Sequence, residues 1–316
     1  MNFRIVTQLF SSCIVLILFS CAGSNSQQTK EDYNTVQVAC DETFRPIMEQ
    51  EFRAFHAKYP EAILDTTFVS ETKAINFILQ DSFRMVITTR PLSEAEKNSI
   101  LNKYKLVVES QPFAHDAIAL IIHPDNTDSL ISINDIRRIV TGKITQWDQI
   151  PNTKTKGPIE LVFDDENSST VRFVRDSLCG GAELKGNLKT AKSNPNVISY
   201  VSQTRRAIGI IGVDWIRNPK DTTNLSFNDK VRVMSVSNSA IAEESNSYQP
   251  VQYYIATADY PLIRKLFISS TEPYMQALNR NFYHYLTDTE GQLIITKSSQ
   301  LLPIVPVHVR SVDVTE

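Results

Sequence analysis

Hydrophobic residues along the first part of the chain follow two alternating spacings. Short apolar runs indicate buried strands at 36–39, 62–69 and 84–88. Each run leads through a polar loop into residues with helical spacing, which predicts helices at 45–59, 73–79 and 94–104, the last capped by Ser93. Strands that alternate with helices predict an α/β fold with mostly parallel sheets flanked by helices.

The pattern continues in the second half. Further strands are expected at 114–124, 158–163, 207–212, 231–236 and 252–257. Helices are expected at 132–142, from 168 onward, at 196–203 and through 271–302, where Gly291 interrupts the helix or starts a new turn. The length allows two lobes, with the strand near 114 leading out of the first and the strand near 252 leading back.

The stretch from Pro158 to Phe173 holds the first candidate site. A strand runs into a loop of small polar residues, and Asn167 or Ser168 is a suitable N-cap for the helix that follows. First-turn N–H groups and the hydroxyls of Ser168, Ser169 and Thr170 would offer donors to an anion. Alternatively, the hydroxyls only cap the helix.

The N-terminus has the features of an export signal. One positive charge and a short apolar segment precede Ser20 and Cys21, which predicts a signal peptide over 1–20. The run Leu18-Phe19-Ser20-Cys21 resembles a bacterial lipobox, so Cys21 is the expected lipidation site, although Phe19 is unusual there. Residues 21–34 are polar and predict a flexible tether to a membrane anchor.

Charge and cysteine content narrow the classes of function. The formal charge is −3 and no basic tract occurs, which argues against a nucleic-acid partner. After Cys21 only Cys40 and Cys179 remain, and they fall in different predicted lobes. We expect two buried thiols, because a disulfide between the lobes would prevent them from moving against each other.

No enzyme motif stands out. The five histidines are scattered without the spacing of metal ligands, so no metal site and no cofactor are expected. Ser168 lacks the flanking glycines of a nucleophile elbow, and Gly142-Lys143-Ile144-Thr145 is not a P-loop. His115-Asp116 is interpreted as a surface turn, and Trp147 and Trp215 as packing residues. The chain is predicted not to be an enzyme.

Several short motifs, in order, resemble the periplasmic phosphate-binding proteins of ATP-binding-cassette transporters. They are Asp41-Glu42-Thr43-Phe44-Arg45-Pro46, Thr88-Thr89-Arg90-Pro91-Leu92, the segment 136–147, Asn167-Ser168-Ser169-Thr170, Ala207-Ile208-Gly209, Tyr260-Pro261-Leu262 and Glu290-Gly291-Gln292. The resemblance implies a two-lobed type II binding-protein fold with the ligand cleft between the lobes. It places lobe one at 35–112, lobe two at 113–250 and the return to lobe one at 251–316.

The resemblance also implies the ligand-binding residues. They are Thr43, Phe44, Ser70, Thr88, Thr89, Arg90, Asp164, Asn167, Ser168, Ser169 and Thr170, with Thr72 an alternative to Ser70. The family places a carboxylate in the second serine-rich loop and an arginine before Ser-Gly-Thr, whereas this chain has Arg90 and Asp164 at those places. Either the exchanged pair retains both functions, or it forms a salt bridge across the cleft mouth. Ser169 replaces the family glycine.

By this resemblance the chain is expected to capture an inorganic oxyanion, phosphate foremost, by hinge closure. It would deliver the anion to the membrane permease of an ABC importer, as an exported monomer that is lipid-anchored to the bacterial cell envelope on the periplasmic side. The sequence leaves open which membrane holds the anchor. The alternative is a ligand-sensing or partner-binding lipoprotein with the same fold and no transport role. The sequence leaves phosphate, sulfate, arsenate and phosphorylated organic anions undistinguished.

Overall fold

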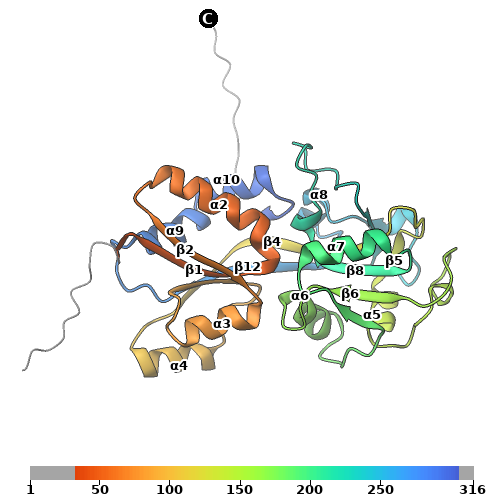
Figure 1. Ribbon diagram of the computed structural model, residues 1–316, viewed down its shortest axis with the longest axis horizontal. Coiled ribbons are helices and arrows are strands. Elements are labelled where there is room, and N and C mark those ends of the chain that lie inside the picture. The colour runs from red at the N-terminus through yellow and green to blue at the C-terminus, as the bar shows by residue number, and fades with distance from the viewer. Residues whose placement is uncertain (1–32, 306–316) are drawn as a thin grey trace, which may run out of the picture.

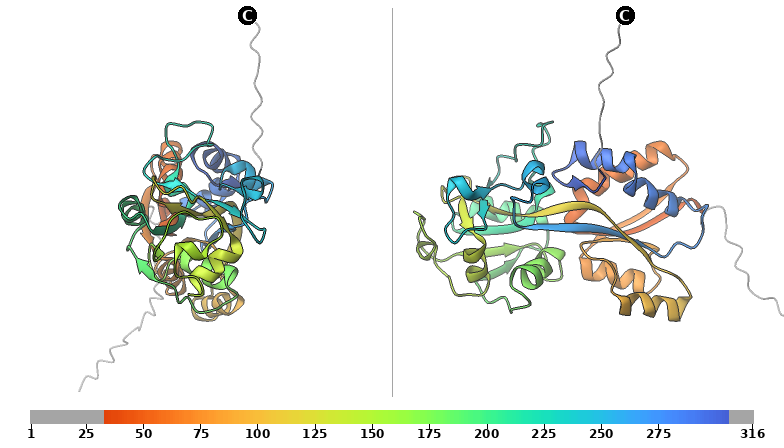
Figure 2. Two further views of the ribbon diagram at one scale, coloured as in Figure 1. Left: turned by 90° about the vertical axis from the view of Figure 1, so that its right-hand side faces the viewer. Right: turned by 180° about the vertical axis from the view of Figure 1, so that it is seen from behind.

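The computed structural model describes residues 33–305 of the chain. Two lobes lie end to end along the long axis, joined by the neighbouring strands β4 (Glu109–Ile122) and β12 (Ile263–Ser270) (Figures 1 and 2). The predicted signal peptide, Cys21 and nearly all of the tether lie outside the described residues.

Lobe one is built on a parallel sheet. Strand β1 (Thr35–Asp41) pairs in parallel with β2 (Ile63–Val69) on one side and β3 (Met85–Thr88) on the other. Helices cover both faces, with α2, α9 and α10 on one and α3 and α4 on the other (Figure 1). Their bounds are α2 Arg45–Lys58, α3 Glu71–Leu79, α4 Glu94–Tyr104, α9 Leu278–Thr287 and α10 Thr289–Ser298.

Lobe two also contains a three-stranded parallel sheet. Strand β6 (Glu160–Phe163) pairs in parallel with β7 (Leu188–Thr190) and with β8 (Ala207–Gly212). A small second sheet holds β5 (Leu130–Ser132), β10 (Ser235–Ser237) and β11 (Ser247–Tyr248). The helices are α5 Ile133–Val140, α6 Ser169–Arg172 and α7 Asn194–Gln203, and a π-helical segment, η3 (Phe173–Leu178), directly continues α6.

The two connecting strands make the sheets continuous. Strand β12 lies antiparallel between β3 and β4, and the second half of β4 pairs antiparallel with β8 and β9 (Arg232–Val233). The parallel strands of both lobes therefore end on either side of the same crossing, which is where ligands bind in open α/β sheets. The predicted limits of the lobes remain a prediction, because β4 and β12 are shared.

Burial of apolar side chains stabilises this arrangement. In lobe one the rings of Phe52 and Phe55 lie 5.2 and 5.0 Å from that of Phe282, which joins α2 to α9. All three residues are almost completely buried, and each such side chain contributes roughly 1.5–3 kcal/mol. This contact ties the start of the fold to its end, because α2 lies one turn after β1 whereas α9 lies more than 200 residues later in the sequence.

Some predicted elements were wrong. The expected strand at 252–257 is the short helix α8 (Gln252–Ala256), and the return to lobe one runs through β12, about ten residues later. The single strand expected at 231–236 is two short strands, β9 and β10. The C-terminal helical segment begins only at Leu278 and breaks at Asp288, so Gly291 lies inside α10 rather than at the break. The last strand among the described residues is β13 (Leu302–Pro303), which pairs with β4.

The structure also bears on the cysteines and on membrane-spanning helices. Cys40 and Cys179 are both free thiols, Cys40 buried and Cys179 half-buried. Among residues 33–305, no helix is both long enough and apolar enough to cross a membrane.

Candidate functional site

The loop after β1 turns tightly and presents a buried hydroxyl. The carboxylate of Asp41 accepts a hydrogen bond from the backbone N–H of Thr43 at 3.0 Å, which fixes the single 3₁₀ turn Glu42–Phe44 (η1). Asp41, Thr43 and Phe44 are all buried. The carbonyl oxygen of Thr43 accepts the indole N–H of Trp215 at 2.7 Å, so this loop of lobe one is in direct contact with lobe two.

The loop after β6 supplies hydroxyls from lobe two. Ser168 is the N-cap of α6 and accepts the N–H of Val171, which confirms one of the two predicted caps. Its own hydroxyl donates to Asp164 at 2.7 Å. Ser169 and Thr170 follow with no exposed surface, so their side chains face the interior of the closed protein.

The positive charge of the site comes from a residue that sequence reasoning missed. Arg264 on β12 is buried; its Nε donates to Asp116 on β4 at 2.7 Å and its Nη1 to the hydroxyl of Ser169 at 3.0 Å. Its guanidinium lies 5.2 Å from the ring centre of Phe44. One arginine on the hinge thus contacts both lobes.

Several buried polar atoms on the facing loops and on the hinge strands have no hydrogen-bond partner within the described part of the chain. They are Asp41 Oδ2, Thr43 Oγ1, Asp116 Oδ1, Thr170 Oγ1, Asn194 Oδ1 and Arg264 Nη2. Each unsatisfied buried group costs about 1–3 kcal/mol, so a group of them in one region is typical of a binding site rather than of a packed core.

Gly212 shows how closely these atoms approach. It ends β8, and a Cβ at this position would lie 2.5 Å from Thr43 Cγ2 and 3.9 Å from Arg264 Nη2. Only glycine therefore lets the first loop of lobe one settle against lobe two. Thr43 and the guanidinium of Arg264 therefore both face the space that a side chain at this position would fill.

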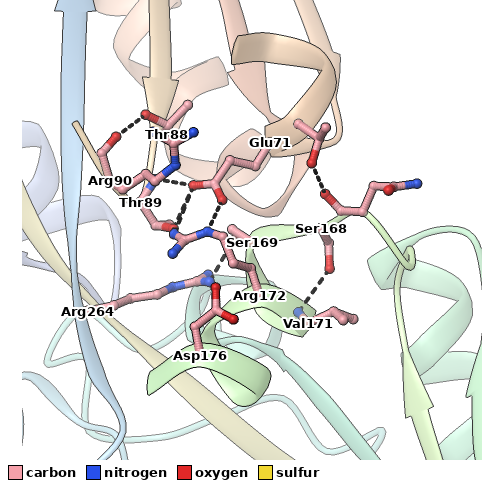
Figure 3. A network of polar contacts seen from close by, with 12 residues as sticks. Glu71, Thr88, Thr89, Arg90, Ser168, Ser169, Val171, Arg172, Asp176 and Arg264 are labelled. Carbon is pink, nitrogen blue, oxygen red and sulfur yellow. Dashed lines mark hydrogen bonds and ion pairs between the residues drawn. The ribbon is translucent and has the colours of Figure 1, made fainter. Parts of the chain in front are cut away.

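A second arginine crosses from lobe two to lobe one. Arg172 donates from Nε to the carboxylate of Glu71 at 2.5 Å and from Nη2 to both Glu71 and Thr89 (Figure 3). The same carboxylate accepts the backbone N–H and the hydroxyl of Thr89, each at 2.7 Å. Burial would raise the pKa of Glu71, but the bonds and charge of Arg172, with the Thr89 donors, bring it below the usual value.

Weaker contacts close the rest of the cleft. The side-chain amide of Asn194 donates to Glu42 at 2.5 Å, and the hydroxyl of Thr72 donates to the carbonyl of Asn167 at 3.3 Å. Burial raises the pKa of Glu42 to about 7, with the charge of Asp164 adding to the effect and Asn194 opposing it. The described structure is therefore the closed form of the two lobes.

A cavity of about 270 Å³ remains at the edge of this interface. It is lined by predicted residues from both lobes, Ser70, Asp164 and Ser168, and by Asp41. Lys73 and Lys192 stand at the same cavity, one from each lobe. Burial raises the pKa of Asp164 and, together with the charge of Glu71, that of Asp41, while Arg264 and Ser169 act in the opposite direction on Asp41.

The predicted ligand loop at the end of β3, which contains Thr88, Thr89 and Arg90, does not pair with Asp164. Arg90 donates two hydrogen bonds to Glu96 at 2.8 and 2.7 Å, and the Thr88 hydroxyl donates to the carbonyl of Arg90. Asp164 is held instead by Ser168 and Asn194. The predicted alternative of an Arg90–Asp164 salt bridge is wrong, because each partner is engaged within or beside its own loop.

The structure therefore brings together part of the predicted set. Ser169 and Phe44 contact Arg264, Thr43 packs against Gly212 close to it, and Thr170 is buried next to Ser169. Thr89 lies beside Arg172, while Asn167 is exposed and donates its N–H to Asp165. The prediction that His115 and Asp116 form a surface turn is wrong. Both lie in β4, and Asp116 is buried there as the partner of Arg264. The contact of each predicted residue with a ligand remains a prediction.

The fold and this interface define a two-lobed binding protein of the class that closes around its ligand. The chain belongs to the PBP superfamily, whose domain model matches residues 25–290. It is 21% identical over 297 residues to the phosphate-binding protein PstS of Borreliella burgdorferi, covering 91% of this chain and 98% of the relative. It is 22% identical over 316 residues to PstS of Bacillus subtilis, covering 97% and 96%.

Solved structures share the fold. The crystal structure of a putative phosphate ABC transporter substrate-binding protein from Clostridium perfringens, with bound phosphate, superposes with a TM-score of 0.69. The match has 22% identity and covers 86% of this chain and all of the other. A phosphate transport receptor from Vibrio cholerae gives a TM-score of 0.60 at 18% identity, covering 83% and 96%.

Proposed function

We propose that the chain is an extracytoplasmic binding protein that captures phosphate between its lobes and delivers it to an ABC importer, without chemical conversion. The observation that carries this proposal is a set of three buried donors that have no hydrogen-bond partner among the described residues, Thr43 Oγ1, Thr170 Oγ1 and Arg264 Nη2. They come from lobe one, lobe two and the hinge. Family membership and relatives named phosphate-binding proteins agree with it.

The donors suit a small tetrahedral anion. Two hydroxyls and a guanidinium can bind separate oxygens of one phosphate, and the closed lobes keep water from competing. The whole chain is acidic, so local donors rather than a general positive field hold the anion. Arg264 is already neutralised in part by Asp116, which lets the site release a doubly charged ligand as well as bind it.

The carboxylate of Asp41 favours phosphate over sulfate. Its Oδ2 has no partner in the described chain, and an ionised carboxylate can only accept hydrogen bonds. Monohydrogen phosphate offers an O–H to that oxygen, whereas sulfate offers none and would leave two negative groups facing each other. A raised pKa at Asp41 is compatible with one proton shared between the carboxyl group and the anion.

Isothermal titration calorimetry tests the proposal. We expect Thr170→Val and Thr43→Val each to weaken phosphate binding by about 1.5–3 kcal/mol, the usual contribution of a hydrogen bond to a charged group. Thr222→Val, an exposed threonine of lobe two, is the matched control and should leave the affinity unchanged. Unchanged affinity in both site variants would refute the site, and equal binding of sulfate would refute the role of Asp41.

The transport and anchoring roles need separate tests. We propose that the mature chain is monomeric and is anchored through a lipid on Cys21, and that it presents phosphate to a membrane permease. Radioactive phosphate uptake in a deletion strain should fall and should recover with the wild-type gene. When the deletion strain carries the Cys21→Ala variant instead, the protein should appear in the soluble fraction. Normal uptake in the deletion strain would instead favour a sensor that does not transport.

A further inference from the structure

The carboxylate of Glu71 is held in the way that proteins hold a bound anion. It accepts four hydrogen bonds, two from Thr89 and two from Arg172, and its side chain is only 3% exposed. The donors are a backbone N–H, a hydroxyl and a guanidinium, which is the set that phosphate-binding sites use. They also come from both lobes, so the carboxylate bridges the closed cleft (Figure 3).

The position of Glu71 places this carboxylate inside the predicted ligand region. It follows Ser70 at the carboxyl end of β2, and one of its donors is Thr89, itself predicted to bind the ligand. Arg172 lies two residues after Thr170 on α6. The charge of Glu71 also acts on Asp41 at the end of β1. The site around Arg264 and the site around Glu71 are therefore neighbours.

We propose that Glu71 is a built-in anion that permanently fills one half of the donor set in the cleft and thereby restricts the ligand to a single compact oxyanion. The identity of that ligand rests on the proposed function, whereas the occupation of Thr89 and Arg172 by Glu71 does not. A longer polyanion such as pyrophosphate is excluded, because its second phosphate would compete with a tethered carboxylate of the same charge.

Removal of the carboxylate should free the half-site for an external anion. In Glu71→Ala the N–H and hydroxyl of Thr89 and the guanidinium of Arg172 lose their acceptor, and the missing side chain leaves room for a small carboxylate. In Glu71→Gln the space stays filled and the charge is lost. The two variants therefore separate an anion-binding role from a simple packing role.

Thermal unfolding with acetate, in the full mature chain, tests the occupied half-site. We expect Glu71→Ala to unfold at a lower temperature than wild type and to be restabilised progressively by millimolar acetate, at constant ionic strength set with chloride. Wild type, Glu71→Gln and the double variant Glu71→Ala/Arg172→Ala should not respond. A response of Glu71→Ala no larger than that of wild type would overturn the inference.

Calorimetry with pyrophosphate tests the consequence for selectivity. Glu71→Ala should bind pyrophosphate at least tenfold more tightly than wild type, and an unchanged pyrophosphate affinity would overturn the selective role. Circular dichroism of each variant confirms folding before titration. If wild type binds no phosphate while acetate still restabilises Glu71→Ala, the proposed function fails and the occupied half-site stands.

Discussion

The indole N–H of Trp215 donates to the carbonyl oxygen of Thr43 at 2.7 Å, across 172 residues of sequence and across the cleft. Trp215 lies in the 3₁₀ turn η4 (Val213–Ile216) that follows β8, whereas Thr43 belongs to the loop after β1. This bond holds the backbone of the ligand loop without using the Thr43 hydroxyl. If the Thr43 hydroxyl binds the ligand as proposed, closure and ligand binding are linked through two different atoms of one residue.

Substitution Trp215→Phe should weaken phosphate binding roughly 2- to 10-fold, because one net hydrogen bond contributes about 0.5–1.5 kcal/mol to the closed form. It should also abolish most of the change in tryptophan fluorescence on binding. The control is Trp147→Phe, which removes a comparable indole bond, to the Arg206 carbonyl at 3.0 Å, within lobe two alone. Equal losses of affinity in both variants would contradict a role in closure.

A steric relationship at the same loop gives a second prediction. Gly212→Ala should prevent full closure and weaken phosphate binding at least tenfold, since its Cβ would lie 2.5 Å from Thr43 Cγ2. Thr43→Ser removes that methyl group and keeps the hydroxyl, so the double variant should recover most of the affinity. Calorimetry on the two single variants and the double variant decides the point. Additive losses would show that the two residues act independently.

Arg264 and Arg90 should differ sharply in their effect on binding. Arg264→Gln should weaken phosphate binding 30-fold or more and destabilise the fold by about 3–5 kcal/mol, because it leaves the buried Asp116 without its charge partner. Arg90→Gln should change the affinity less than threefold, because the Arg90 guanidinium is held by Glu96 on the α4 side. Phosphate titrations and urea unfolding of both variants test this ranking. The reverse order would restore Arg90 as the ligand that the sequence suggested.

The sequence was sufficient for the alternation of strands and helices because buried apolar runs and helical spacing are local signals. It failed at β12, where Arg264 and Lys265 interrupt the apolar pattern. Arg264 is buried in a strand only because Asp116, which lies 148 residues earlier, neutralises it. Pairing across that distance leaves no periodic trace, so the strand and its charge were missed together.

The candidate site shows the same limit. Hydroxyl loops at strand ends could be identified, because ligands in open α/β sheets bind beyond the carboxyl ends of the strands. The partners of those loops could not be identified from spacing. Arg90 has a local signal that explains its position, since Ser93 and Glu96 form a capping box that holds Glu96 toward Arg90. Glu71 and Arg172 meet only after the lobes close.

Glu51, which lies outside the cleft, should make the stability of the fold depend on pH. It is fully buried in α2, neither carboxylate oxygen has a partner among the described residues, and burial raises its pKa to about 8 despite the opposing effect of Tyr285. The pKa in the unfolded chain is about 4.3. Between these values the folded chain keeps a proton that the unfolded chain has released, so the free energy of unfolding falls as pH rises.

Substitution Glu51→Gln should remove this contribution, because the amide resembles the protonated acid in shape and does not titrate. Relative to wild type, the variant should gain stability by up to about 1.4 kcal/mol per pH unit between pH 5 and 8. Glu49→Gln, an exposed position on the same helix, should follow the wild-type curve. Other buried acids, among them Asp214, whose pKa burial raises to about 7, contribute equally to both curves and cancel in the difference. Parallel curves for wild type and Glu51→Gln from urea unfolding at several pH values would mean that Glu51 is ionised in the folded chain.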